Sequence, residues 1–152
     1  MRLIGLTGYA GAGKDAAAAG LIENGWTRVA LADPLKDVAR ALGWDGNKDD
    51  SGRAFLQTLG ESVRNNVHRD VWVWAAKQRI ESVDGPVVVT DVRYPNEADM
   101  IHELGGVLVR IDRPGVGPIN GHESESFVAS LPADRVIVND GTLNDLVERL
   151  RP

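Results

Sequence analysis

The residues best suited to chemistry form a glycine-rich segment near the start of the chain. The segment reads Gly8-Tyr9-Ala10-Gly11-Ala12-Gly13-Lys14 and matches the G-x-x-x-x-G-K pattern of a Walker A phosphate-binding loop. Glycines let backbone N–H groups turn inward around phosphate oxygens, and the lysine can neutralise charge that develops during phosphoryl transfer. We therefore expect the whole segment to bind nucleotide phosphates, with Lys14 also catalytic. The alternative is a glycine turn with a chance lysine.

The next residue, Asp15, departs from the general motif, which has Ser or Thr at this position to bind Mg²⁺. A carboxylate there can bind the metal directly or through a water molecule. Without a cation it would repel the phosphates, so we expect nucleotide affinity to depend on Mg²⁺. The alternative is that Asp15 only stabilises the first turn of a helix through the helix dipole.

Three charged residues follow predicted strands and are candidates for the same site. Because the carboxyl ends of parallel strands border the ligand crevice, Asp33, Asp91 and Arg93 should face the glycine-rich loop. Asp33 could orient the acceptor or a metal-bound water, Asp91 could join the Mg²⁺ shell, and Arg93 could hold an acceptor phosphate with its planar fork. The alternatives are Asp33 as the N-cap of a helix that begins at Pro34, and a local ion pair between Asp91 and Arg93.

Gln57 and Arg64 lie seven residues apart, about two helical turns, and so share one helix face. Gln57 could read a base edge and Arg64 could hold a phosphate; exposed residues on a solvated face are the alternative. Trp72 and Trp74 diverge by about 200° on a helix, so both cannot line one pocket. One of them could stack on a base or form a pocket wall, against core packing as the alternative.

A loop over residues 113–125 contains three glycines and two prolines, which predicts a mobile lid. Arg113 opens this loop and is the candidate that closes over the transferring phosphoryl group. Arg110, on the preceding strand, could face either side of the sheet. His122 lies in the loop without partners at zinc-ligand spacing, so a histidine-based zinc site is not expected.

The elements that must position these residues alternate between strand and helix. Strands are predicted at 2–7, 27–31, 86–90, 107–111 and 136–138, and helices at 14–23, 34–42, 53–67, 71–83, 96–104 and 142–150. This order predicts an α/β fold with a five-stranded parallel sheet and helices on both faces. The gap before the third strand is longer than a simple crossover, so we interpret residues 34–85 as a helical substrate-binding insert; the alternative is that these helices only cover the sheet.

Composition narrows the functional classes. A chain of 152 residues predicts one domain over 1–152. The absence of cysteine excludes a disulfide scaffold, a zinc-thiolate site, an iron–sulfur cluster and a cysteine nucleophile. The net charge of −5 argues against nucleic acid as a partner, and no apolar run is long enough to span a membrane. We expect a cytoplasmic protein, in the host cytoplasm if a phage encodes it.

A GTPase interpretation fails on the order of two motifs. Asn47-Lys48-Asp49-Asp50 matches the guanine-reading N-K-x-D pattern, and Asp112-Arg113-Pro114-Gly115 matches D-x-x-G. In GTPases D-x-x-G comes first, whereas here it comes second. We therefore interpret both matches as chance.

Several segments together resemble the bacteriophage deoxynucleoside monophosphate kinases, a branch of the P-loop nucleoside monophosphate kinase group, and they span nearly the whole chain in order. These segments are Leu6-Thr7-Gly8 to Lys14-Asp15, Ala32-Asp33-Pro34-Leu35-Lys36, Leu56-Gln57-Thr58-Leu59-Gly60-Glu61 with Arg64, Asp70-Val71-Trp72-Val73, Thr90-Asp91-Val92-Arg93-Tyr94-Pro95-Asn96-Glu97 and His122-Glu123-Ser124-Glu125. The closing Val138-Asn139-Asp140-Gly141-Thr142 resembles the end of small P-loop kinases, including dephospho-coenzyme A kinases. Members of the phage family also have Asp after the loop lysine.

The resemblance implies a P-loop kinase fold and transfer of the ATP γ-phosphate to a deoxynucleoside monophosphate, with ATP and Mg²⁺ required. It favours Gln57, Arg64 and Trp72 for the acceptor, adds Lys36 and Glu125 to the acceptor site, and places Asn139 near the donor adenine. It also implies small-molecule partners and leaves a homodimer open. A dephospho-coenzyme A kinase-like activity and a non-catalytic nucleotide-binding regulator remain as alternatives. The accepted bases, the discrimination against ribose and the role of His122 stay open.

Overall fold

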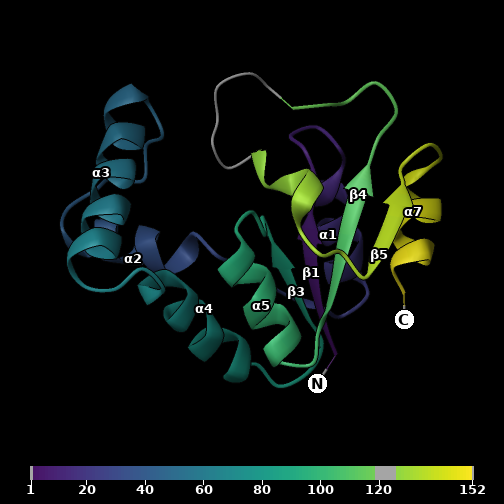
Figure 1. Ribbon diagram of the computed structural model, residues 1–152, viewed down its shortest axis with the longest axis horizontal. Helices are drawn as coiled ribbons and strands as arrows, with labels where there is room; N and C mark the ends of the chain where they lie inside the picture. The colour runs from purple at the N-terminus through teal and green to yellow at the C-terminus, as the bar shows by residue number, and fades with distance from the viewer. Residues whose placement is uncertain (1, 119–125, 152) are drawn as a thin grey trace.

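The computed structural model describes residues 2–118 and 126–151. Within these residues five strands form one sheet, in the order β2-β3-β1-β4-β5 (Figure 1). The strands are β1 (Leu3–Thr7), β2 (Thr27–Ala30), β3 (Val87–Thr90), β4 (Val107–Asp112) and β5 (Arg135–Val138). Every neighbouring pair is parallel, which confirms the predicted sheet.

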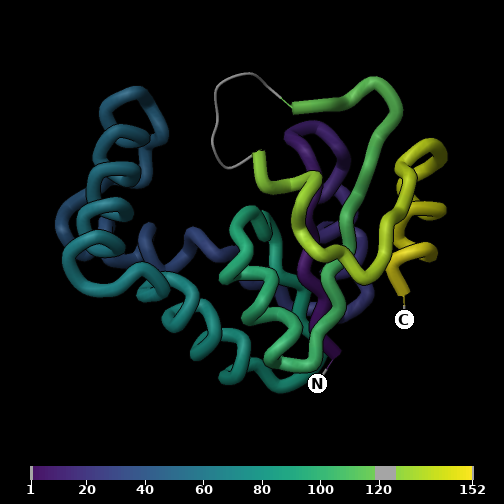
Figure 2. The backbone as a smooth tube through the Cα atoms, in the orientation of Figure 1, coloured from purple at the N-terminus to yellow at the C-terminus, as the bar shows by residue number. Residues whose placement is uncertain are grey.

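Helices cover both faces of the sheet because its central strands are apolar on both sides. Leu3, Val87 and Leu108 pack on one face, against α4 (Val71–Glu81) and α5 (Pro95–Glu103). On the opposite face Ile4, Leu6, Val88 and Val109 pack against α1 (Lys14–Glu23) and α7 (Leu143–Leu150). The tube in Figure 2 shows this three-layer arrangement, with α5 and α1 on opposite sides of the strands. A parallel sheet buried on both faces is stable only under such cover.

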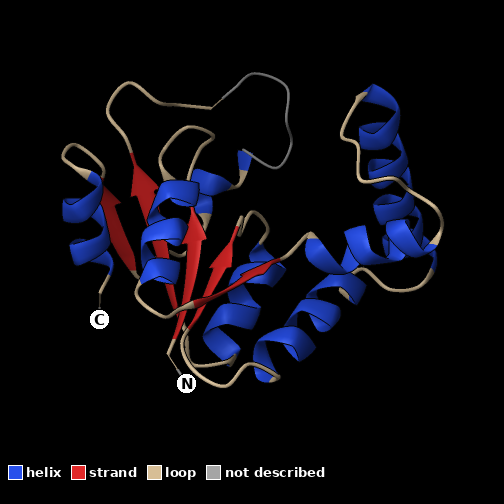
Figure 3. Cartoon of the chain, turned by 180° about the vertical axis from the view of Figure 1, so that it is seen from behind, coloured by secondary structure: helices blue, strands red, loops and turns tan. Residues whose placement is uncertain are grey.

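The three helices between β2 and β3 differ in what they contact. In α4, Ala76 and Ile80 are fully buried in the cluster that covers the sheet. By contrast, α2 (Asp33–Ala41) and α3 (Asp50–Asn66) extend away from the sheet (Figure 3). The Trp72 Nε1 donates to the Gly60 carbonyl at 3.1 Å and ties α4 to α3. Residues 34–85 therefore include one helix that belongs to the sheet layer and two that project beside it.

Side chains in the loop before α3 hold that loop in a fixed turn. The Asp45 carboxylate accepts from the Asn47 backbone N–H at 2.8 Å, and the Trp44 Nε1 donates to the Asn47 carbonyl at 3.0 Å. Asp49 is the N-cap of α3 and accepts from the Gly52 N–H at 2.8 Å. The N-K-x-D match thus falls on turn and cap residues. The cap also explains why α3 begins at Asp50, earlier than its apolar pattern predicts.

The remaining differences from the predicted elements are small. A short 3₁₀ helix over Val128–Ser130 precedes β5 and was not predicted from the sequence.

Of the helices in residues 2–118 and 126–151, none combines the length and the apolar character needed to cross a bilayer.

Candidate active site

The glycine-rich loop connects β1 to α1 and leaves the start of α1 open. Gly13 is the N-cap of α1 with φ 106°, and it carries no side chain that could cap the helix. Gly8 has φ 144°, and a Cβ there would lie 2.5 Å from the Ile111 carbonyl oxygen. Only glycine fits both positions. The first backbone N–H groups of α1 are therefore available to an anion at the positive end of the helix dipole.

The ammonium of Lys14 lies across this loop. Its Nζ donates to the Gly8 carbonyl at 2.8 Å and to the Tyr9 carbonyl at 2.9 Å. These contacts hold a positive charge beside the helix start, where phosphate oxygens would bind. A bound phosphate would offer the same ammonium a charged acceptor in place of neutral carbonyls.

A pocket of about 290 Å³ opens at the loop, and we call it the loop pocket. Ala10, Gly11, Gly13, Lys14, Asp15, Ala16, Asp91 and Arg93 line it. The structure therefore brings Asp15, Asp91 and Arg93 together, as their positions after the loop and after β3 predict. Their roles there stay predictions.

Asp91 reaches the loop pocket through an unusual backbone conformation. Its φ is 64°, in the left-handed region that few side chains other than Asn and Asp adopt readily. The Arg93 Nη2 lies 3.5 Å from the Asp91 Oδ1, so the local ion pair considered as the alternative is present. Both side chains nevertheless line the pocket, so the ion pair does not remove them from the site.

The carboxylates of Asp15 and Asp91 fit a magnesium ion. The described residues contain no cluster of three or more His, Cys, Asp or Glu side chains that could enclose a metal by themselves. Mg²⁺ needs no such cluster, because it is commonly bound by one or two carboxylates together with substrate phosphates and waters.

Two other predicted residues contact the glycine-rich loop from later parts of the chain. The Arg113 Nη1 donates to the Gly11 carbonyl at 3.4 Å, which places this exposed guanidinium over the loop. The Asn139 Nδ2 donates to the Ala12 carbonyl at 2.9 Å. A Cβ at Gly13 would lie 2.5 Å from the same Nδ2, so the amide packs directly against the loop. Asn139 thus supports the loop, and its predicted contact with adenine stays untested.

The structure describes Arg110 and the first part of the predicted lid. The Arg110 Nε pairs with the Asp112 Oδ1 at 3.1 Å, so this arginine has a local carboxylate partner. The lid over 113–125 is described only to residue 118. Glu125, His122 and Ser124 lie outside the described residues.

A second pocket, of about 170 Å³, lies between the end of α3, the start of α4 and the start of α5, and we call it the arginine pocket. Arg64, Arg69, Trp72, Val73, Tyr94, Asn96 and Glu97 line it. The Arg64 guanidinium lies 5.7 Å from the centre of the Tyr94 ring, within reach of a cation–π interaction. Trp74 is 50% exposed and stacks on His68 instead, which agrees with the predicted divergence of the two tryptophans.

Three predicted acceptor residues do not line either pocket in the described part of the chain. Gln57 is exposed, and its Nε2 donates to the Glu61 Oε1 at 3.1 Å. Asp33 accepts from the Ala30 N–H at 3.1 Å and lies 3.9 Å from the Lys36 Nζ. The proposed N-cap role of Asp33 is wrong, because Ala32 is the N-cap and Asp33 already lies in the first turn of α2.

Lys36 is half-buried beside Asp33, and its charge is partly offset there. Burial lowers the pKa of Lys36, the charge of Lys48 lowers it further, and the charge of Asp33 opposes the shift. The Asp33–Lys36 pair lies on the first turns of α2.

Tyr94, Asn96 and Glu97 line the arginine pocket but were not predicted as site residues. The signal was available in the sequence. Pro95 is the first residue of α5 and Glu97 the third, and this spacing is typical of a helix N-terminus. A helix that starts two residues after Arg93 places its first side chains close to that arginine.

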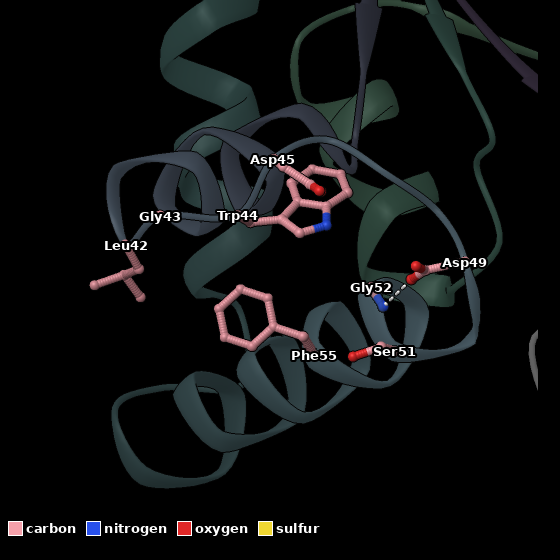
Figure 4. Close-up of a pocket in the computed structure, with 8 residues that line it drawn as sticks. All are labelled: Leu42, Gly43, Trp44, Asp45, Asp49, Ser51, Gly52 and Phe55. Atoms are coloured by element: carbon pink, nitrogen blue, oxygen red, sulfur yellow. Dashed lines mark hydrogen bonds between the residues drawn. The ribbon is translucent and has the colours of Figure 1, made fainter.

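A third pocket, of about 430 Å³, lies between the loop after α2 and the start of α3. Figure 4 shows the Trp44 and Phe55 rings on its two sides, with Asp45, Asp49 and Ser51 around them. None of the predicted site residues lines this pocket, so we do not assign either substrate to it.

Comparison with known proteins identifies relatives of the whole chain. The model of a family described as deoxynucleotide monophosphate kinase matches residues 40–150. A protein of Acanthamoeba polyphaga mimivirus, named as a deoxynucleotide monophosphate kinase, is 32% identical over 99% of this chain and 94% of its own. The deoxynucleotide monophosphate kinase of Enterobacteria phage T4 is 28% identical over 66% of this chain. The match spans 44% of the T4 protein and 42% of its relative in Escherichia phage RB69, less than half of each.

Solved structures share the fold at low sequence identity. Shikimate kinase from Aquifex aeolicus gives a TM-score of 0.58 at 11% identity, over 99% of this chain and 94% of that one. TT1252 from Thermus thermophilus gives 0.55 at 20% identity, over 99% and 98% of the two chains. These similarities confirm the fold expected from the sequence.

Proposed function

The chain belongs to the deoxynucleotide monophosphate kinase family, and from this premise we propose that it transfers the γ-phosphate of ATP to a deoxynucleoside monophosphate. The products are ADP and the deoxynucleoside diphosphate. The family and the P-loop kinase fold make the chain a phosphotransferase; the acceptor and the residues that hold it are our proposal. We further infer that both substrates are free small molecules, drawn from the cytoplasmic nucleotide pool.

One observation carries this proposal: the loop pocket and the arginine pocket share a single connecting segment. Arg93 lines the loop pocket, and the next residue, Tyr94, lines the arginine pocket. Two substrates that meet end to end need two adjacent binding sites, one for the donor phosphates and one for the acceptor nucleotide. Lys14 lines the loop pocket and Arg64 lines the arginine pocket, so each site contains a positive side chain.

Positioning and charge neutralisation account for the reaction. The attacking acceptor phosphate oxygen is already an anion, so a general base is hardly needed. Lys14 and the N–H groups at the start of α1 would stabilise charge on the donor phosphates, and Arg113 would add a second cation from above the loop. Arg64 would hold the acceptor nucleotide and Arg93 the acceptor phosphate between the two pockets, while Trp72 forms part of the acceptor wall.

Asp15 and Asp91 would hold Mg²⁺, which supplies charge neutralisation between the donor phosphates when it is bound. We predict that removing Mg²⁺ with a chelator weakens ATP binding by about tenfold or more, because the Asp15 carboxylate then repels the phosphates. Calorimetry of ATP binding with and without the chelator measures this directly.

The matched variant for this prediction is Asp15→Asn, which keeps the shape of the side chain and removes its charge. In chelator, D15N should bind ATP more tightly than the unmodified protein, and its affinity should depend less on Mg²⁺. Equal ATP affinity of the unmodified protein with and without chelator contradicts the prediction.

An acceptor panel tests the proposed function. The protein, ATP and Mg²⁺ are combined with each of the four common deoxynucleoside monophosphates, their ribose counterparts and dephospho-coenzyme A, and ADP formation is followed. We expect turnover with at least one deoxynucleotide. Turnover only with dephospho-coenzyme A supports the small-metabolite kinase instead. ATP binding without turnover on any acceptor supports a non-catalytic regulator.

A further inference from the structure

Glu97 holds the segment that separates the two pockets. It is the third residue of α5, and its Oε2 accepts from the Arg93 backbone N–H at 2.7 Å and from the Tyr94 N–H at 3.0 Å. Neither N–H belongs to the sheet ladder, because β3 ends at Thr90. One carboxylate oxygen therefore fixes two successive peptide groups of the turn.

The two residues held by Glu97 line different pockets. The Arg93 side chain lines the loop pocket, whereas Tyr94 and Glu97 itself line the arginine pocket. A change in the backbone at residues 93 and 94 would therefore move one wall of each pocket at once. Misplacement of reacting groups by about 1 Å can cost a large part of the rate of a transfer reaction.

A second contact anchors the same segment to the start of α4. The Asn96 Nδ2 donates to the Asp70 Oδ1 at 2.7 Å, and Asp70 is the N-cap of α4. The segment is thus attached to β3 at one end and to α4 at the other, with the Glu97 carboxylate between these attachments. Glu97 is the residue that sets the turn itself.

Glu97 acts on this segment as a hydrogen-bond acceptor, through one oxygen of its carboxylate. Burial raises the pKa of Glu97, while the hydrogen bonds from Arg93 and Tyr94 and the charges of Arg93 and Arg64 oppose the rise. A glutamine side chain offers the same acceptor oxygen at the same reach, whereas alanine leaves both N–H groups without this partner.

We infer that Glu97 is a positioning residue that fixes the spacing between the donor and acceptor pockets through the Arg93 and Tyr94 backbone. This inference rests on the proposed function for its kinetic consequence. The hydrogen bonds from the Arg93 and Tyr94 N–H groups to the Glu97 carboxylate can be tested separately, by a measurement that needs no enzymatic turnover.

The test compares Glu97→Ala and Glu97→Gln with Asp99→Ala, which removes an exposed carboxylate two residues further along α5. With the deoxynucleotide that the panel identifies, E97A should lower kcat about tenfold or more, with the KM for ATP changed less than about threefold. E97Q should restore most of the lost kcat, and D99A should not reproduce the loss. A kcat in E97A within about threefold of the unmodified protein overturns the inference, as does an E97Q variant as slow as E97A.

Hydrogen–deuterium exchange, resolved for the Arg93 and Tyr94 amides by NMR, separates failure of this inference from failure of the proposed function. Both amides should exchange about tenfold or more faster in E97A and be protected again in E97Q. Unchanged exchange in E97A overturns the inference even where catalysis is found. If both amides exchange faster in E97A but the unmodified protein phosphorylates no deoxynucleotide, the role of Glu97 in holding the turn is supported and the proposed function is rejected.

Discussion

Replacing Lys14 by alanine is expected to lower kcat for phosphoryl transfer on the order of 10³-fold. The Lys14 ammonium lies within 3 Å of two carbonyls of the glycine-rich loop, beside the N–H groups that would bind the donor phosphates. Its charge counters negative charge that grows on the phosphoryl oxygens in the transition state, and losing one such preorganised contact typically costs a factor of 10² to 10³. Steady-state assays with the preferred acceptor measure the loss.

Lys48→Ala is the matched control for K14A. Lys48 is exposed in the loop before α3 and belongs to the N-K-x-D match that we interpret as chance. K48A should keep kcat within about twofold of the unmodified protein, whereas a guanine-reading role for this match would make the variant defective. A K14A variant that retains more than a tenth of kcat contradicts the role assigned to Lys14, provided that its unfolding temperature is unchanged.

The local parts of the site could be predicted from the sequence because their geometry depends on adjacent residues. A strand, three loop glycines and a lysine at a helix start predict a phosphate-binding loop from residues that are adjacent in the sequence. The valines of β3 and the apolar β1 likewise predict a parallel sheet with helices on both faces. Both predictions rest on residue type and spacing alone.

The direction of side chains at the strand ends could not be predicted in this way. Asp33 and Asp91 both come shortly after strands that end at the same edge of the sheet. Asp33 enters the first turn of α2, and its carboxylate turns back to the Ala30 N–H. Asp91 instead adopts φ 64° and lines the loop pocket. The first aspartate has helical backbone and the second has left-handed backbone, and aspartate tolerates both conformations.

The sequence predicted Arg64 and Trp72 as acceptor residues, but the way the arginine pocket brings them together could not be predicted from it. Arg64 on α3 meets Tyr94 before α5 only because α4 packs between them, with Trp72 bonded to the Gly60 carbonyl and Asp70 bonded to Asn96. Helix periodicity places Gln57 and Arg64 on one face of α3, but that face is long enough to leave Gln57 exposed near Glu61. Contacts between distant helices are set by packing, which spacing along one helix does not reveal.

Replacing Arg93 by alanine is expected to lower kcat/KM for the acceptor on the order of 10²-fold. Arg93 lines the loop pocket from the segment that also borders the arginine pocket, so its guanidinium is the cation best placed between donor and acceptor phosphates. A planar guanidinium can bind a phosphate through two parallel hydrogen bonds. Arg93→Lys keeps the charge but loses this geometry, so R93K should recover only a small part of the activity.

Arg93 also pairs with Asp91 at 3.5 Å, and a role limited to that ion pair would give a different kinetic pattern. In that case R93A would alter the Mg²⁺ concentration needed for activity, because Asp91 is a proposed metal ligand, and saturating Mg²⁺ would restore turnover. A clamp on the acceptor phosphate instead predicts that the defect persists at saturating Mg²⁺ and follows the acceptor concentration. Arg53→Ala, which removes an exposed arginine from α3 that lines neither pocket, controls for a general loss of positive charge. If saturating Mg²⁺ alone restores the activity of R93A, Arg93 does not bind the acceptor phosphate. Another cation must then bind it, and Arg64 is the side chain to test.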